Sequence, residues 1–163
     1  MKIIPLETVH WQAVKSIYQE GILTGTATLE TIAPDWEKWN PEHLSHSRFV
    51  ITEDEIVVGW AALTPVSGRC VYAGVAEVSV YIKASERGRG IGTLLLHELI
   101  RSSETQNIWT LQAGIMSENQ ASIRLHEKCG FRLLGYREKI GKLNNEWKDV
   151  YLLERRSKIT GAD

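Results

Sequence analysis

AEVSVYIKASERGRGIGTLLLHELI, the stretch from Ala76 to Ile100, is the part of the sequence that decides the fold. From Glu77 to Ile82 apolar and polar side chains alternate, which predicts a half-buried β-strand. From Thr93 onward leucine and isoleucine recur at helical spacing, which predicts an amphipathic α-helix. Three glycines lie in the segment Arg87 to Gly92, where the strand turns into the helix.

This strand–glycine–helix connection is suited to binding an anion. The first amides of a helix have no partner within the helix and carry the positive end of its dipole. Glycine lets the backbone approach a phosphate, and the two arginines add charges that pair with phosphate oxygens. The sequence therefore predicts a pyrophosphate-bearing cofactor held by Arg87, Gly88, Arg89, Gly90, Ile91, Gly92 and Thr93. The alternative is that the glycines only shape a turn.

Two common nucleotide-binding motifs do not fit this segment. A dinucleotide fingerprint needs G-x-G-x-x-G, but Gly88 and Gly90 are followed by Thr93 at the position of the third glycine. A P-loop needs a lysine directly before its final serine or threonine, and Gly92 stands there instead. What remains is the pattern R-x-x-G-x-G after a strand.

This pattern resembles the acyl-CoA loop of the GNAT superfamily of N-acetyltransferases. A second element, Asn119-x-x-Ser122 followed by Leu125 to Phe131, is similar to the second cofactor element of that superfamily. The segments Ala76 to Tyr81 and Trp147 to Val150 make the resemblance more particular. They are similar to the phosphinothricin, methionine sulfoximine and arsinothricin N-acetyltransferases.

The resemblance implies an α/β (α+β) fold, with a GNAT-like mixed, mostly antiparallel central sheet flanked by helices in a single domain, residues 1–157. It also implies acetyl-CoA as co-substrate, no metal, and a homodimer. The hydrophobic pattern predicts the element order β-α-α-β-β-β-α-β-α-β-β. Residues 158–163 are expected to be a frayed tail.

Several local expectations accompany this order. Thr8 is expected to cap the first helix, and Pro41 to restart the second helix rather than continue it. Gly130 is expected to end a helix as a left-handed cap. Gly135 to Glu146 is expected to connect two strands, although Tyr136 to Ile140 can also be interpreted as an extension of the first.

Composition limits the partners of the chain. The 163 residues carry 19 Lys and Arg against 20 Asp and Glu, without a basic run, so a nucleic-acid partner is not indicated. Cys70 and Cys129 show neither a metal-ligand spacing nor a disulfide framework. No signal peptide and no apolar run of membrane length are visible, which favours the cytoplasm over a membrane.

The expected reaction requires that the acceptor amine first lose a proton. An amine attacks a thioester only when it is neutral, so an ammonium substrate must lose a proton near the site, and a carboxylate can accept it. The resemblance implies Glu77 as this general base; the alternative is an exposed charge or a salt-bridge partner. It also implies that backbone amides of Val80, Tyr81 and Ile82 hold the oxyanion and the pantetheine arm.

Two polar residues of the second element are further candidates. His126 stands where many relatives have a tyrosine, which implies a general acid for the departing thiolate. The alternative is a packed or solvated histidine. Asn119 is expected to contact the cofactor arm.

The substrate-binding residues implied by the resemblance are Leu29, Arg69, Cys70, Val71 and Tyr72. An arginine suits a carboxylate or phosphinate by bidentate pairing. The alternative for the segment before Glu77 is ordinary loop structure. The first loop departs from the branch, because Leu29-Glu30-Thr31-Ile32-Ala33 lacks both the usual aromatic and the usual acid–proline pair.

The predicted function is an acetyl-CoA-dependent N-acetyltransferase that acts by direct attack in a ternary complex. Its predicted acceptor is the α-amine of a small amino acid, or of a toxic glutamate or methionine analogue of the phosphinothricin or methionine sulfoximine type. The alternatives are another amine acceptor (a polyamine, an aminoglycoside or a protein N-terminus), an acyl-CoA sensor without catalysis, and a structural interaction protein.

Overall fold

A seven-stranded sheet forms the centre of the structure, a computed structural model that describes residues 1–163. Its strands are β1 (Lys2–Pro5), β2 (Phe49–Glu53), β3 (Ile56–Pro65), β4 (Val75–Ile82), β5 (Thr110–Met116), β6 (Arg132–Leu143) and β7 (Glu146–Arg156). Its helices are α1 (Trp11–Leu23), α2 (Trp36–Glu42), α3 (Ile91–Thr105) and α4 (Gln120–Lys128). The strand order is β1-β2-β3-β4-β5-β7-β6, and only β4 and β5 pair in parallel. The mixed, mostly antiparallel sheet predicted from the sequence is therefore confirmed.

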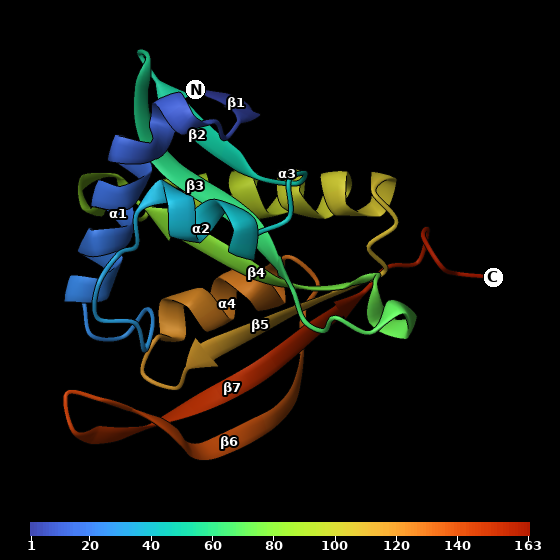
Figure 1. Ribbon diagram of the computed structural model, residues 1–163. Helices are drawn as coiled ribbons and strands as arrows, with labels where there is room; N and C mark the ends of the chain where they lie inside the picture. Colours follow the sequence, from blue (N-terminus) through green and yellow to red (C-terminus); the bar gives the residue numbers. More distant parts are fainter.

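The helices cover both faces of this sheet (Figure 1). On one face Trp11 of α1 and Trp39 of α2 pack with Trp60 of β3 in one apolar cluster. On the other face buried leucines of α3, with Leu95 and Leu99 among them, pack on the central strands. Each such fully buried side chain contributes roughly 1.5–3 kcal/mol to folding. None of the helices is both long and apolar enough to cross a membrane.

The sheet opens between its two parallel strands. β4 and β5 pair at only three positions, the last of which joins Glu77 to Gln112. Beyond that point β4 stays paired with β3 as far as Ile82, whereas β5 continues beside β7. The two strands therefore diverge into a wedge, and one edge of β4 has no strand partner there.

Two helix-boundary predictions were wrong and one is confirmed. Thr8 does not cap α1, because Thr8–His10 forms a separate turn of 3-10 helix and α1 begins at Trp11. α2 runs through Pro41, which lies in the last turn of a short helix and so removes only one backbone hydrogen bond. Gly130 follows α4 with a φ of 91°, as a left-handed cap requires.

The prediction of a connector from Gly135 to Glu146 was also wrong, whereas its alternative, that Tyr136 to Ile140 extends the first strand, is confirmed. Most of this segment belongs to β6, which forms a long hairpin with β7. The hairpin turns at Asn144 and Asn145, whose φ angles of 50° and 67° are typical of a two-residue turn that matches the strand twist. The two adjacent asparagines are the feature of the sequence that indicates this turn.

The hairpin is interrupted by a bulge in β6. Arg137 pairs with Val150 and Gly141 pairs with Lys148, so three residues of β6 face one residue of β7. That one residue, Asp149, accepts a hydrogen bond from the backbone N–H of Lys139 at 2.7 Å. Lys139 has a φ of 47°, in the left-handed region. The bulge thus changes which side chains of β6 point to the inner face.

The end of the chain runs back to α3. The Thr160 hydroxyl donates to the Glu104 carbonyl oxygen at 2.6 Å, and Arg156 donates to the Thr160 carbonyl oxygen at 3.0 Å. These contacts oppose fraying of the first residues of the expected tail.

Candidate active site

Two cavities meet at β4. The wedge cavity, of about 400 Å³, lies between β4 and β5 and reaches Glu77. The glycine-loop cavity, of about 460 Å³, lies beside the connection from Arg87 to Thr93. Val80, Tyr81 and Asn119 line both cavities. A ligand can therefore extend along β4 from one to the other.

The glycine-loop cavity gathers most of the predicted cofactor residues. Gly88 and Gly90 have φ angles of 80° and 79°, where a side chain would be strained, and open space surrounds the position of a Cβ at both. α3 begins at Ile91, so its unpaired first amides lie at this cavity. The predicted residues that line it are Val80, Tyr81, Ile82, Arg87, Gly88, Gly90, Ile91, Gly92, Thr93 and Asn119.

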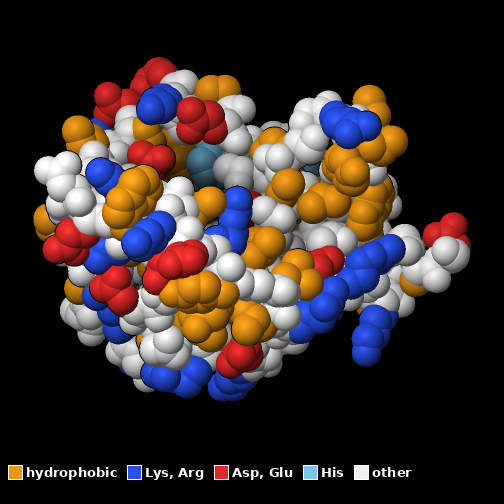
Figure 2. Space-filling view, turned by 90° about the horizontal axis from the view of Figure 1, so that it is seen from below, with side chains coloured by type: hydrophobic (Ala, Val, Ile, Leu, Met, Phe, Trp, Pro, Cys, Tyr) orange, Lys and Arg blue, Asp and Glu red, His pale blue; other side chains and the backbone are white.

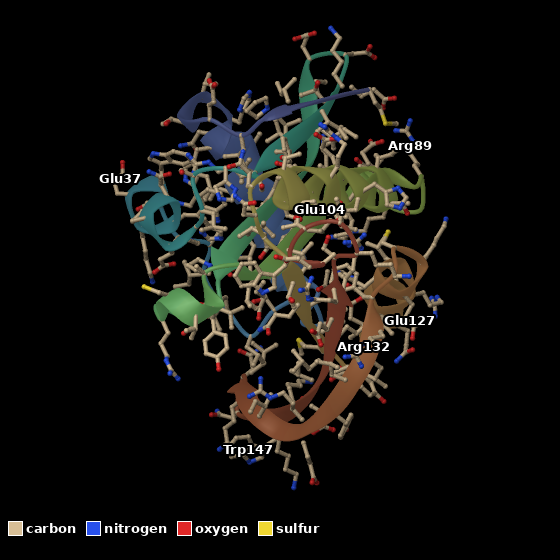
Figure 3. The ribbon with its side chains drawn as sticks, turned by 90° about the vertical axis from the view of Figure 1, so that its right-hand side faces the viewer. Glu37, Arg89, Glu104, Glu127, Arg132 and Trp147 are labelled. Carbon is tan, nitrogen blue, oxygen red and sulfur yellow. The ribbon has the colours of Figure 1, made fainter.

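Arg89 is the predicted cofactor residue that does not line either cavity. Its guanidinium pairs with Glu53 at 2.8 Å and also with Glu86. The hydrogen bonds from Arg89 lower the pKa of both carboxyl groups. In Figure 3 Arg89 lies at one end of α3. Its side chain is therefore already engaged within the protein.

The free edge of β4 presents backbone groups to the wedge. The Lys83 N–H donates to the Val58 carbonyl oxygen of β3 at 2.9 Å. Because the backbone groups of successive residues point to opposite sides of a strand, those of Val80 and Ile82 face away from β3, into the wedge. The backbone of Tyr81 faces β3, and its side chain, rather than its amide, reaches the cavities.

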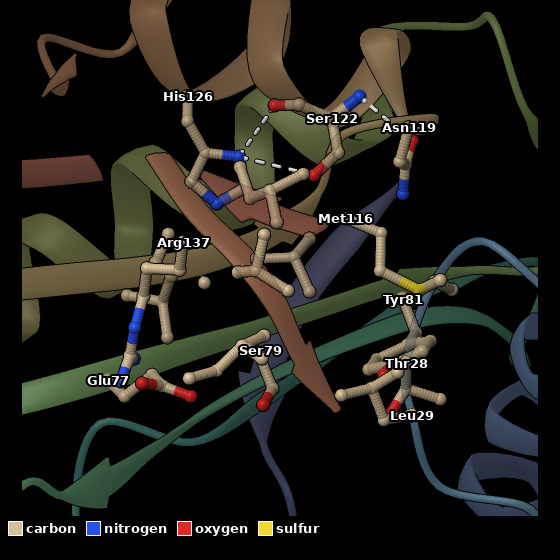
Figure 4. Close-up of a pocket in the computed structure, with 18 of the residues that line it drawn as sticks. Thr28, Leu29, Glu77, Ser79, Tyr81, Met116, Asn119, Ser122, His126 and Arg137 are labelled. Carbon is tan, nitrogen blue, oxygen red and sulfur yellow. Dashed lines mark hydrogen bonds between the residues drawn. The ribbon is translucent and has the colours of Figure 1, made fainter. Parts of the chain in front are cut away.

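Glu77 lies at one end of the wedge cavity (Figure 4). It is partly buried, and its Oε2 accepts a hydrogen bond from Gln112 Nε2 at 2.9 Å. It is also the only acidic residue that lines this cavity. A carboxylate held in place beside an open cavity can accept a proton from a bound group.

His126 of α4 and Asn119, the residue directly before α4, line the same cavity (Figure 4). His126 Nδ1 lies 2.7 Å from the Ser122 carbonyl oxygen, which can only accept, so Nδ1 carries the proton and Nε2 is a free acceptor. Burial lowers the pKa of His126, which favours the neutral ring. Asn119 Oδ1 accepts from the Ser122 N–H at 3.2 Å and so caps α4.

Tyr81 lies where the two cavities join. Its ring stacks on Trp60 with centroids 4.9 Å apart, and the Tyr18 ring packs against it at 4.8 Å. Burial raises the pKa of both tyrosines. Both hydroxyls therefore remain protonated near neutral pH and can donate hydrogen bonds.

The predicted substrate residues divide into two groups. Leu29 lines the wedge cavity and packs against Gly141 of β6, where a Cβ would come within 2.7 Å of it. Arg69 to Tyr72, in contrast, lie at an exposed turn of 3-10 helix before β4 and do not line the cavity. The Arg69 guanidinium lies over the Tyr72 ring, 5.6 Å from its centroid.

Gln112 and Arg137 are polar residues of this site that sequence reasoning missed. Gln112 faces Glu77 only because of the β4–β5 register, which the sequence pattern does not contain. Arg137 lines the wedge cavity from β6, the segment that was expected to be a connector.

Large apolar side chains of the β6–β7 hairpin remain exposed. They are Leu133, Leu134, Tyr136, Ile140 and Trp147. Figure 3 shows Trp147 on the hairpin, and Figure 2, which looks at the molecule from below, shows groups of hydrophobic side chains between charged ones. Such a surface is compatible with the homodimer, which stays a prediction.

Known proteins resemble this chain in sequence and in fold. Residues 11–131 match the acetyltransferase (GNAT) family. A phosphinothricin N-acetyltransferase of Streptomyces coelicolor is 33% identical over 122 residues, which cover 74% of this chain and 71% of that protein. An L-methionine sulfoximine/L-methionine sulfone acetyltransferase of Salmonella typhimurium is 27% identical over 147 residues, covering 87% of this chain and 86% of that one.

A solved structure agrees with these matches. The phosphinothricin acetyltransferase of Sinorhizobium meliloti, in complex with AcCoA, superposes with a TM-score of 0.88 at 25% identity, over 99% of this chain and 91% of that chain. The resemblance inferred from Arg87 to Gly92 and from Asn119 to Phe131 is thereby confirmed.

Proposed function

We propose that this chain, which belongs to the acetyltransferase (GNAT) family, transfers the acetyl group of acetyl-CoA to the α-amine of a small amino acid or of a toxic glutamate or methionine analogue. The main support is the junction of the two cavities on β4, with a glycine loop in one and the carboxylate of Glu77 in the other. This junction allows a phosphate-bearing carrier and an amine to meet on one strand.

The residues of the glycine-loop cavity fit acetyl-CoA. Gly88 and Gly90 leave space for a pyrophosphate against the first amides of α3, and Arg87 adds a positive charge. The unpaired backbone groups of Val80 and Ile82 suit the amides of a pantetheine arm. Acetyl-CoA, when bound, supplies the thioester carbonyl that the amine attacks. The acetyl-CoA complex of the Sinorhizobium meliloti relative supports this assignment.

In the proposed reaction Glu77 is the general base. It removes a proton from the acceptor's ammonium group, directly or through a water, and so generates the neutral amine that attacks. Gln112 holds the carboxylate by its hydrogen bond and fixes which way its second oxygen faces. In this proposal the Val80 N–H, which faces the wedge, donates to the negative charge that develops on the carbonyl oxygen.

His126 contributes in this proposal as a hydrogen-bond acceptor. With Nδ1–H bound to the Ser122 carbonyl oxygen, an acid role requires a doubly protonated ring, which burial disfavours. Its free Nε2 instead suits an N–H group of the bound ligands. Asn119 keeps its amide nitrogen available for the cofactor arm, because its oxygen is used in the cap.

The substrate class is supported by the relatives, which are named for phosphinothricin and for methionine sulfoximine and sulfone. A cytoplasmic location and a homodimer are part of the same proposal.

The direct test is a panel assay that measures free thiol released from acetyl-CoA. The acceptors are phosphinothricin, methionine sulfoximine, methionine sulfone, arsinothricin, the common amino acids, and several polyamines and aminoglycosides. We expect turnover with the amino-acid acceptors. Turnover only with the cationic amines would overturn the substrate class. Acetyl-CoA binding without any turnover would favour a sensor.

A further inference from the structure

The wedge cavity is lined by one positively charged residue and one negatively charged residue. Among the side chains that line it, Arg137 is the only lysine or arginine and Glu77 is the only acid. The eight ion pairs of the structure do not include Arg137. In Figure 4 its guanidinium extends toward the end of the cavity where Glu77 lies. The cavity therefore combines an unpaired cation with a carboxylate.

The bulge of β6 builds this arrangement. In a regular strand, residues three apart point to opposite faces, yet Arg137 and Ile140 both line the wedge cavity. The extra residues of the bulge restore them to the same face. Asp149 fixes the bulge from β7, because its carboxylate accepts from the Lys139 N–H at 2.7 Å and from the Tyr136 hydroxyl.

We propose that Arg137 binds the carboxylate of the acceptor amino acid while Glu77 faces its ammonium group. This inference rests on the proposed function, and it assigns a binding residue to the carboxylate of the acceptor. An α-amino acid carries its ammonium and its carboxylate on one carbon, and the cavity offers the two opposite charges at one end. A guanidinium suits a carboxylate because its planar N–H groups match the two oxygens. Arg137 thereby selects zwitterionic acceptors over plain amines.

Arg69 is the competing arginine. It was the arginine expected from the sequence, but it lies at the exposed turn before β4, with its guanidinium over the Tyr72 ring. It lines neither of the cavities that meet at β4. When the amine of a substrate lies at Glu77, Arg137 is therefore the arginine that can bind its carboxylate.

The test compares one acceptor with its own carboxamide. For the best amino acid of the panel and its α-carboxamide, kcat/KM is measured in the wild type and in Arg137→Met. We expect the wild type to prefer the carboxylate by about 10- to 150-fold, the range of a hydrogen bond to a charged group. In Arg137→Met this preference should fall to a few-fold, through loss on the carboxylate alone. Comparing the preference between variants cancels the difference in amine acidity between the two acceptors.

Two matched variants complete the kinetic experiment. Arg132→Met removes an arginine of the same strand that pairs with Glu154 instead of facing the cavity, and it should keep the wild-type preference. Arg69→Met should also keep it. An unchanged preference in Arg137→Met, or a preference lost in Arg69→Met instead, would overturn the assignment.

A binding measurement separates this inference from the proposed function. Calorimetric titration of the same two acceptors into Glu77→Gln, with and without Arg137→Met, needs no turnover. Carboxylate binding that is lost with Arg137 supports the inference even if no amine is acetylated. Equal binding of the acid and the carboxamide to Glu77→Gln overturns it even if acetylation is observed.

Discussion

Gln112 Nε2 donates a hydrogen bond to Glu77 Oε2 at 2.9 Å, across the last paired position of β4 and β5. The contact lies where the two strands separate, so it aims a carboxylate into the wedge. In the proposed reaction this makes Gln112 a positioning residue for the general base.

Gln112→Leu should lower kcat/KM for the acceptor while acetyl-CoA affinity stays at the wild-type value. The reason is that the Glu77 carboxylate loses the hydrogen bond that fixes its orientation at the wedge cavity. Gln112→Glu should lower kcat/KM further, since a second carboxylate at this distance repels the first. Initial rates with the best amino-acid acceptor, and calorimetric titration with acetyl-CoA, measure this. Kinetics that coincide with the wild type would remove Gln112 from the mechanism.

His126→Asn should make stability less dependent on pH. An unfolded histidine binds a proton near pH 6.5, whereas burial lowers the pKa of folded His126. The stability that the neutral ring contributes is thus fully present above about pH 6.5 and is lost as pH falls through the lower folded pKa. Asparagine keeps a donor for the Ser122 carbonyl oxygen and does not titrate.

Urea unfolding of His126→Asn and of the wild type, at pH 8 and at pH 5, tests this direction of the pH dependence of stability. The wild type should lose more stability on acidification than the variant. His43, whose pKa burial also lowers, is present in both proteins and cancels in the comparison. An equal loss in the two proteins would contradict the buried neutral tautomer.

Asp149→Ala should raise the KM for the acceptor by roughly tenfold and leave the KM for acetyl-CoA unchanged. Without Asp149 the bulge loses its hydrogen bonds to Lys139 and Tyr136, and Arg137 loses its fixed position; a tenfold effect corresponds to about 1.4 kcal/mol. Asp149→Asn retains an acceptor for the Lys139 N–H and should be intermediate. Parallel rises in both KM values would indicate general destabilisation instead of a positioning role.

Gly90→Ala should weaken acetyl-CoA binding by roughly tenfold, because a side chain at a φ of 79° costs about 1–2 kcal/mol and the loop is expected to shift to relieve it. Gly68→Ala is the control. Gly68 has open space around its Cβ position and no positive φ. Calorimetric titration with acetyl-CoA measures both variants. Equal affinities for Gly90→Ala and the wild type would show that the loop does not hold the phosphates in this conformation.

The segments with strong local signals could be predicted from the sequence. The alternation from Glu77 to Ile82 and the leucine spacing after Thr93 give β4 and α3, since both patterns follow from which side chains the sheet buries. The glycine loop was expected because glycine lets the backbone approach a phosphate, and in the structure Gly88 and Gly90 adopt left-handed backbone there.

The rest of the site depends on contacts between distant segments. Gln112 meets Glu77 through a parallel register that no local pattern encodes. Arg137 enters the cavity because Asp149, on the opposite strand, holds a bulge that breaks the alternation of β6. Arg89 has the positive charge of a phosphate-binding residue, but it already pairs with Glu53 at the end of β2. Each of these outcomes is decided by tertiary structure.

In the proposed reaction Glu77 activates the amine beside bound acetyl-CoA. The most direct measurement is acetyl transfer by Glu77→Gln, with calorimetric titration of acetyl-CoA on the same preparation. We expect kcat/KM for the best amino-acid acceptor to fall by about 10²–10⁴-fold while acetyl-CoA affinity stays at the wild-type value. Transfer at the wild-type rate by Glu77→Gln would contradict it.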